Sequence, residues 1–129
     1  TAATAKKKNN KVNGTYSAWF DKGVVEGGAA AYFNGIHPTY DLHAGESETG
    51  FGLMRYPELL DKAQIASLKP NYEGEFLFER IGAGAKDFIE CGAPDAYFGD
   101  PAAATAENAD KQYDVFSDYV VDEVRALLG

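Results

Sequence analysis

The C-terminal part of the chain constrains the fold most strongly, because it has the pattern of one long amphipathic helix. Gly99-Asp100-Pro101 supplies a helix start: Asp100 can cap the first turn, and proline is well tolerated at the first helical position. Apolar side chains then recur at three- and four-residue spacing, at Tyr113, Phe116, Val120, Val124 and Leu127. The pattern predicts a helix over 101–127 with one apolar face.

The rest of the chain alternates candidate strands with candidate helices. Aromatic and β-branched residues predict strands over 14–20 and 75–79. Helices are expected over 24–33, 46–55 and 61–68. We therefore expect an α/β fold in which a mostly parallel sheet is flanked by helices. Only two or three strands can be placed, and a parallel sheet needs cover on both faces, so the chain is expected to be part of a larger unit.

The charge balance and the single cysteine exclude several classes of protein. The chain of 129 residues has a net charge of −8, which argues against a nucleic-acid backbone as partner. Its one cysteine, Cys91, cannot form an internal disulfide and fits a reducing compartment, so we expect a cytoplasmic protein. No apolar run approaches the length of a membrane span. Residues 1–13 contain four lysines and are expected to form a solvated basic segment ahead of a domain over 14–129.

Both histidines of the chain lie close to three acids in one short segment. His37 and His43 accompany Asp41, Glu46 and Glu48. Imidazole and carboxylate groups bind borderline metals and transfer protons near neutral pH, so the segment is a candidate site. The segment also has the composition of a helix entry, where the helix dipole stabilises acids. In that interpretation Glu46 is an exposed acid of the first turn, while Glu48 is open to either role.

Two segments match known motifs in order and spacing. The first, over 41–49, is Asp-Leu-His-Ala-Gly-Glu-Ser-Glu-Thr, and the second, over 98–107, is Phe-Gly-Asp-Pro-Ala-Ala-Ala-Thr-Ala-Glu. They resemble the Asp-x-His-Ala-Gly-x-x-Glu-Thr and Gly-Asp-Pro-x-x-Ala-Thr-x-Glu segments of the creatininase family, the creatinine amidohydrolases and their relatives. The resemblance covers residues 14–129 and implies the C-terminal half of a layered creatininase-like domain. One departure is Gly50, followed by Gly52; both are expected to weaken the helix and loosen its packing.

The resemblance implies metal-assisted hydrolysis of an amide bond, in a cyclic amide or a peptide. In such chemistry a divalent ion activates water and polarises the carbonyl, and a side chain passes a proton to the leaving nitrogen. By resemblance His43 is the catalytic proton shuttle, Tyr40 contacts the substrate, and Asp41 either orients His43 or binds a polar group of the substrate. Glu48 is the one candidate metal ligand of this chain, and zinc, manganese and iron all suit such a ligand set.

The resemblance also implies partners. In the family an earlier half of the domain carries most of the metal ligands, in a Glu-x-His pair and a Gly-His-Gly-Gly-Asn-like segment. We therefore expect those ligands on the N-terminal half of the enzyme or on a second polypeptide, within an oligomer. Asp100 and Glu107 of the second motif are expected to build a helix beside the site rather than take part in the chemistry.

Two alternative functions stay open. An N-terminal threonine can be a nucleophile with its own amine as base, so cleavage of a precursor before Thr1 would create a catalytic residue there. Alternatively, the chain is a non-catalytic subunit that keeps the fold and assembles with an active enzyme.

Overall fold

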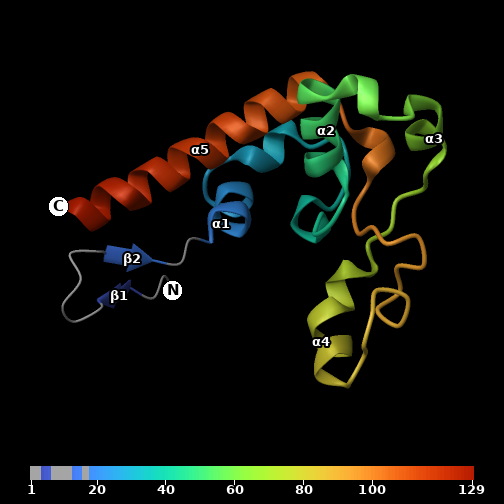
Figure 1. Cartoon of the computed structure of the whole chain (residues 1–129), viewed down its shortest axis with the longest axis horizontal. Helices are drawn as coiled ribbons and strands as arrows, with labels where there is room; N and C mark the ends of the chain where they lie inside the picture. The colour runs from blue at the N-terminus through green and yellow to red at the C-terminus, as the bar shows by residue number, and fades with distance from the viewer. Residues whose placement is uncertain (1–3, 7–12, 16–17) are drawn as a thin grey trace.

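Helices dominate the computed structural model, which describes residues 4–6, 13–15 and 18–129. Figure 1 shows α5 along one edge of the molecule, with α2 packed against the half of α5 nearer to its N-terminus. The strands are β1 (Thr4–Lys6) and β2 (Asn13–Thr15), and the α-helices are α1 (Trp19–Val25), α2 (Glu46–Arg55), α3 (Lys62–Ser67), α4 (Leu77–Gly82) and α5 (Ala106–Leu128). The 3₁₀ helices are η1 (Ala29–Tyr32), η2 (Pro38–Tyr40), η3 (Pro57–Leu59), η4 (Glu73–Phe76) and η5 (Pro101–Ala103).

The predicted α/β fold with a mostly parallel sheet is wrong for the part of the chain that the structure describes. There the sheet is a single antiparallel pair, β1 with β2. The candidate strand over 14–20 gives way to α1 at Trp19, and the candidate strand over 75–79 forms the end of η4 and the start of α4. Parallel strands are buried on both faces and need long β-branched runs. The sequence has no run of β-branched residues longer than a pair such as Val24-Val25. These segments therefore form helices instead of strands.

Two helix predictions are confirmed. Helix α2 has the predicted bounds of 46–55, and α3 lies within the predicted 61–68. The Asp61 carboxylate caps α3 by accepting hydrogen bonds from the N–H groups of Ala63 and Gln64, both at 3.0 Å. These two elements were predictable because apolar spacing and a start signal agree in each.

Two other helix predictions need correction. The long helix starts later than predicted, because Pro101–Ala103 forms η5 and α5 begins only after Thr105. The Thr105 hydroxyl accepts a hydrogen bond from the Asn108 N–H at 3.1 Å and so takes the capping role expected of Asp100. The helix predicted over 24–33 is divided in two, since Gly28 has a φ of 83°, a left-handed conformation that separates α1 from η1.

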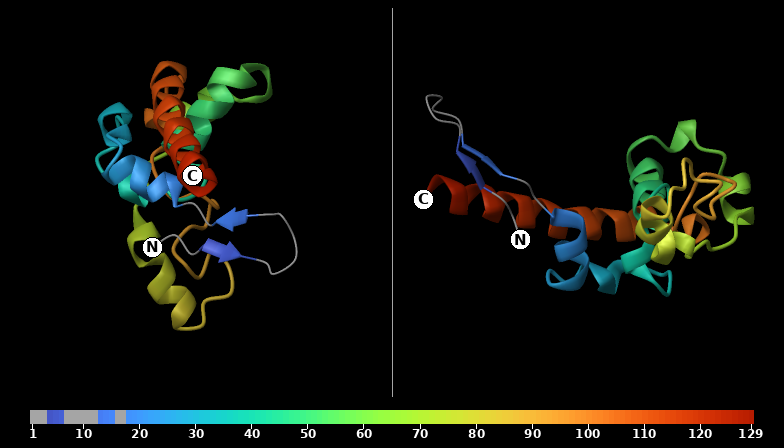
Figure 2. Two further views of the ribbon diagram at one scale, coloured as in Figure 1. Left: turned by 90° about the vertical axis from the view of Figure 1, so that its left-hand side faces the viewer. Right: turned by 90° about the horizontal axis from the view of Figure 1, so that it is seen from below.

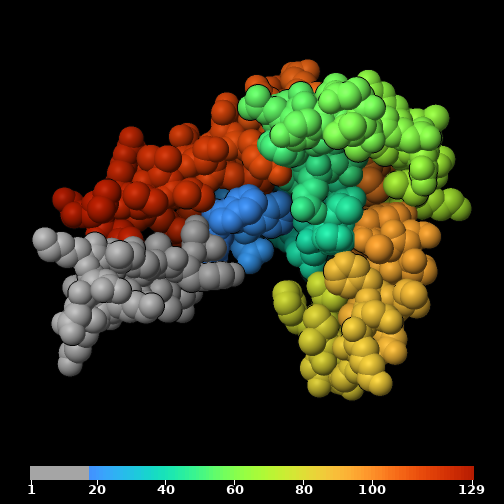
Figure 3. Space-filling model, viewed as in Figure 1, coloured from blue at the N-terminus to red at the C-terminus, as the bar shows by residue number. Residues whose placement is uncertain are grey.

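Two small apolar clusters form the core. In the first, Val24 and Ala29 pack against Phe116 of α5, and the rings of Trp19 and Phe20 lie 5.1 and 5.3 Å from the Phe116 ring. Figure 2 shows α1 beside α5 in both views. The second cluster joins α4 to the segment before η5 through Leu77, Cys91, Ala93 and Phe98. Figure 3 shows the α4 segment projecting from the body formed by α1, α2 and α5. None of the helices within residues 18–129 is long and apolar enough to cross a bilayer.

The glycines of α2 tighten its packing, so the prediction of a loose helix is wrong. A Cβ atom added at Gly50 would lie 2.9 Å from the Cβ of Ala109, and one added at Gly52 would lie 3.0 Å from Leu60. Glycine inside a helix costs about 0.5–1 kcal/mol relative to alanine. Here that cost is offset because the missing side chain lets α2 approach α5 closely.

Candidate active site

The two motif segments lie more than fifty positions apart in the sequence and meet in an isolated antiparallel bridge between His43 and Phe98. The Phe98 N–H donates to the His43 carbonyl at 2.8 Å, and the Phe98 carbonyl accepts from the Leu42 N–H at 3.0 Å. Phe98 is fully buried, so the bridge is anchored in the core. The backbone around His43 is therefore fixed from both sides, which is what a positioned functional side chain requires.

Asp41 lies beneath this bridge and caps α2. Its two carboxylate oxygens accept hydrogen bonds from the N–H groups of Glu46 (2.5 Å) and Ser47 (3.0 Å), at the positive end of the helix dipole. Cβ atoms added at Gly45 and Gly99 would lie 1.9 and 2.1 Å from the same Asp41 oxygen. One glycine from each motif thus makes room for this carboxylate. Burial raises the pKa of Asp41, although its backbone hydrogen bonds act in the opposite direction.

Glu46 is buried, so the prediction of an exposed first-turn acid is wrong. Only 2% of the residue is exposed, and its carboxylate accepts hydrogen bonds from the N–H groups of Asn34 (2.6 Å) and Gly35 (2.7 Å). Burial raises the pKa of Glu46, and the negative charges of Asp41 and Asp100 raise it further. Nothing in the local pattern signals this role, because the two partner N–H groups come from a loop more than ten residues earlier.

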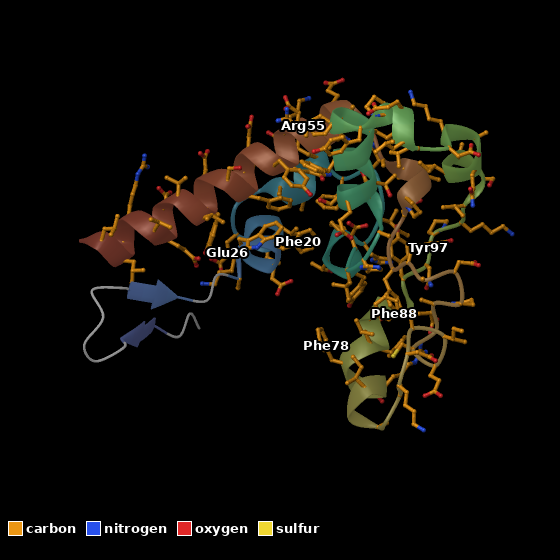
Figure 4. All side chains as sticks on the ribbon, in the orientation of Figure 1. Phe20, Glu26, Arg55, Phe78, Phe88 and Tyr97 are labelled. Carbon is orange, nitrogen blue, oxygen red and sulfur yellow. The ribbon has the colours of Figure 1, made fainter. Side chains whose placement is uncertain are left out.

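His43 and Glu48 form the accessible part of the site. Their side chains are 50% and 61% exposed, and His43 Nδ1 lies 4.0 Å from Glu48 Oε2. Glu48 also accepts a hydrogen bond from the Ala44 N–H at 2.5 Å. Ala44 has a φ of 47°, a left-handed conformation that is uncommon and strained for alanine. The Phe88 ring, labelled in Figure 4, lies edge-on to the imidazole with ring centroids 5.0 Å apart.

Two cavities adjoin Glu48. The first has a volume of about 490 Å³ and is lined by Trp19, Phe20 and Tyr113 together with Asp41, Ser47 and Glu48. Figure 4 labels Phe20 on α1, the element that supplies two of its aromatic walls. The second cavity, of about 340 Å³, lies between α2, α3 and the segment before η5, and its lining includes Ala44 and Glu48. Sequence reasoning missed the aromatic lining residues, because Trp19 and Phe20 lie in a segment predicted as a strand and the helical spacing of Tyr113 predicts a core position.

The described residues do not complete a metal centre. Over 18–129 and the two short strands, no group of three or more His, Cys, Asp and Glu side chains is placed to hold an ion. Catalytic zinc sites use three protein ligands, whereas His43 and Glu48 supply two donors. The buried carboxylates of Asp41 and Glu46 are already engaged by backbone N–H groups. This donor set therefore does not fit a metal ion without further ligands.

The predicted site residues differ in where the structure places them. Asp41, His43 and Glu48 come together at the entry to α2. Tyr40 lies in η2 with its ring 5.8 Å from that of His37, and it is not among the described residues that line either cavity. Thr1 lies outside the described residues. The substrate contacts of Tyr40 and Asp41, the metal bond of Glu48 and the proton transfer of His43 stay predictions.

Comparison with known proteins gives one match. A family model described as creatininase, creatinine amidohydrolase, matches residues 2–124. No curated protein and no solved structure matches the chain. The matched range includes both segments that meet at the bridge between His43 and Phe98.

Proposed function

Because the chain belongs to the creatininase family, we propose that it forms one wall of the active site of a hydrolase that cleaves a cyclic amide or a peptide bond. Membership of this family implies a hydrolase that acts on amides. The observation that carries the proposal is the pair of His43 and Glu48. Both side chains are at least half exposed, Glu48 lines two cavities, and the backbone of His43 is bridged to the buried Phe98.

His43 is the proton carrier of the proposed reaction. In amide hydrolysis the oxygen of water bonds to the carbonyl carbon, the C–N bond breaks, and the leaving nitrogen takes up a proton. An imidazole gains and loses a proton near neutral pH, so it can accept a proton from the attacking water and deliver it to the leaving nitrogen. Glu48 is the acid beside the ring, with Oε2 4.0 Å from Nδ1, and the Phe88 ring packs against the imidazole with centroids 5.0 Å apart.

In this proposal the remaining metal ligands of the active site are supplied by polypeptide outside this chain. The family implies a divalent metal, and such an ion activates water and polarises a carbonyl when it is bound. Since the described residues supply two donors, we propose that the other ligands come from the N-terminal half of the enzyme or from a second chain in an oligomer. Addition of that polypeptide to the chain is then a requirement for activity.

Substitution of His43 tests this function. The assay uses the chain together with the polypeptide that completes it, with creatinine, formamide and a capped dipeptide as probes. We expect His43→Ala to lower kcat by about 10²–10⁴-fold, the usual contribution of a positioned acid–base group. Free imidazole should restore part of the rate. His37→Ala is the matched control, since His37 is the other histidine of the chain and packs against Tyr72, away from Glu48.

The same experiment can contradict the proposal. Full activity in His43→Ala would mean that this chain is a non-catalytic assembly subunit. Absence of turnover on all three probes by the complete wild-type assembly would count against an amide hydrolase of this kind. Equal losses in His43→Ala and His37→Ala, without rescue by imidazole, would indicate a structural effect.

A further inference from the structure

Both cavities border Glu48 of the proposed catalytic pair. Leu42 lines the first cavity and Ala44 lines the second, while His43, which lies between these two residues in the sequence, lines neither. Nδ1 of His43 is 4.0 Å from the Glu48 carboxylate. An extended ligand that contacts Glu48 can therefore reach into both cavities and pass close to His43.

The first cavity suits a flat apolar group. Trp19 and Phe20 of α1 and Tyr113 of α5 form its walls, and the rings of Trp19 and Phe20 are nearly perpendicular, with centroids 5.8 Å apart. Aromatic side chains favour edge-on and offset contacts with a further ring and bury a large apolar area. Trp19 is 37% exposed, so part of its surface is available to a ligand.

The second cavity is aliphatic. Its apolar lining comes from four residues around η3 and α3, namely Leu59, Leu60, Ile65 and Leu68. Leu59 is 75% exposed, which is unusual for a large apolar side chain that lines a cavity. Three acidic residues, Glu48, Asp61 and Asp95, also line this space. A ligand that carries its own carboxylate there would be repelled, while a neutral aliphatic group would gain from burial.

We propose that the substrate is an extended amide with an apolar group on each side of the scissile bond, one aromatic and one aliphatic, and without acidic groups. This inference rests on the proposed function and adds the substrate class. The aromatic group occupies the cavity of Trp19 and Tyr113, and the aliphatic group occupies that of Leu59 and Ile65. The cavities of about 490 and 340 Å³ each fall in the range of small-molecule sites. A compact cyclic amide would occupy one of them and leave the other empty.

Trp19 provides a direct test, because it is the sole tryptophan of the chain and lines the first cavity. The full chain is titrated with N-acetyl-phenylalanyl-leucine amide and with the reverse order, N-acetyl-leucyl-phenylalanine amide, while Trp19 emission is followed. We expect a saturable shift in emission with one of them. N-acetyl-glycyl-glycine amide and the aspartyl analogue should bind at least about tenfold more weakly, as expected for loss of a large apolar contact.

A pair of exposed leucines separates cavity binding from general apolar binding. Leu59→Glu places a charge in the second cavity and should weaken binding of the preferred peptide by about tenfold or more. Leu128→Glu is the control, because Leu128 is 74% exposed at the end of α5 and lines neither cavity. Both positions are exposed, so neither change is expected to unfold the chain.

The outcomes distinguish this inference from the proposed function. Equal affinity for the glycyl and the apolar peptides, or equal weakening by Leu59→Glu and Leu128→Glu, overturns the extended apolar substrate. Hydrolysis of creatinine that depends on His43 would still stand in that case. Conversely, selective peptide binding without hydrolysis of any amide supports the two cavities as a binding site and overturns the hydrolase.

Discussion

At the scale of single residues, the site depends on how closely the backbone approaches one carboxylate. Asp41 accepts N–H groups from the first turn of α2, and Gly45 and Gly99 leave the space that its oxygen occupies. Any other residue at these positions would place a Cβ atom 1.9 or 2.1 Å from that oxygen, far closer than van der Waals contact allows. Both glycines are therefore required by the Asp41 side chain, which occupies the space where their Cβ atoms would lie. Through that side chain they help to hold the loop that carries His43.

Substitution of Gly45 tests this packing. In Gly45→Ala the new Cβ atom would lie 1.9 Å from Asp41 Oδ1, so the carboxylate or the backbone must move. We expect the free energy of unfolding to fall by about 1–3 kcal/mol, the usual cost of overpacking, and we expect hydrolysis to fall with it. Urea denaturation followed by circular dichroism measures the first effect.

Gly82 supplies the matched control for that change. It lies in the last turn of α4, and a Cβ atom there would meet nothing within 4 Å. Gly82→Ala should therefore be neutral or stabilise the chain by about 0.4–1 kcal/mol, since alanine restricts the unfolded state. If Gly45→Ala and Gly82→Ala had the same free energy of unfolding, the close approach of Gly45 to Asp41 would not contribute to stability.

At the scale of elements, local pattern predicted α2, α3 and most of α5, and it failed for α4 and for the sheet. The bounds of α2 and the cap of α3 follow from spacing and start signals that lie within each helix. The expected strands failed because strand formation depends on distant partners, and residues 77–82 instead form α4, in which Leu77 and Ile81 lie one helical turn apart. The contact between α2 and α5 could not be predicted either. A glycine inside a helix predicts lower helix stability, and its role in close packing is known only once the neighbouring helix is placed.

The contact between α2 and α5 makes a prediction of its own. Gly50→Ala adds a methyl group 2.9 Å from the Cβ of Ala109. Overpacking costs about 1–3 kcal/mol, which exceeds the gain of about 0.5–1 kcal/mol that alanine brings to a helix. We therefore expect a net loss of stability in thermal or urea denaturation.

A double-mutant cycle shows whether that loss comes from the helix contact. Ala109→Gly removes the opposing methyl group, so the Gly50→Ala change should cost less in its presence, with a coupling energy of about 1 kcal/mol. Strictly additive effects would assign the loss to some other neighbour, such as the Thr105 carbonyl, which lies 3.2 Å from the same point.

At the scale of the whole molecule, buried carboxylates join segments that are distant in sequence. Asp41 holds the start of α2 beside the second motif, and Glu46 holds the Asn34-Gly35 loop against the same helix. The sequence singled out this segment as a candidate site. It could not divide the acids between accessible and buried roles, because Glu46 and Glu48 are two positions apart and only tertiary packing distinguishes their surroundings.

Burial of Glu46 makes the stability of the fold depend on pH. Burial raises its pKa above the ordinary value of 4.5, so the folded chain binds this proton more tightly than the unfolded chain does. The stabilisation from the protonated group is fully present below the unfolded pKa and is lost as the pH rises through the folded pKa. Glu46→Gln cannot ionise; it keeps one oxygen acceptor and loses the other of the two that accept from the Asn34 and Gly35 N–H groups, a loss that does not depend on pH. As the pH rises above 4.5, the free energy of unfolding of Glu46→Gln should therefore increase relative to that of the wild type.

Glu107 gives a control of opposite sign for the same measurement. Its side chain is exposed on α5, and the hydrogen bond from Lys111 at 2.8 Å lowers its pKa. The stability that the Glu107–Lys111 pair contributes is present above the unfolded pKa of Glu107 and is lost as the pH falls through the folded pKa. The free energy of unfolding of Glu107→Gln should therefore decrease relative to that of the wild type as the pH rises. Urea denaturation of the three proteins across the acid range measures both trends. Parallel curves for Glu46→Gln and the wild type would mean that the buried carboxylate keeps its ordinary pKa, and the two backbone N–H groups would then fully offset its burial.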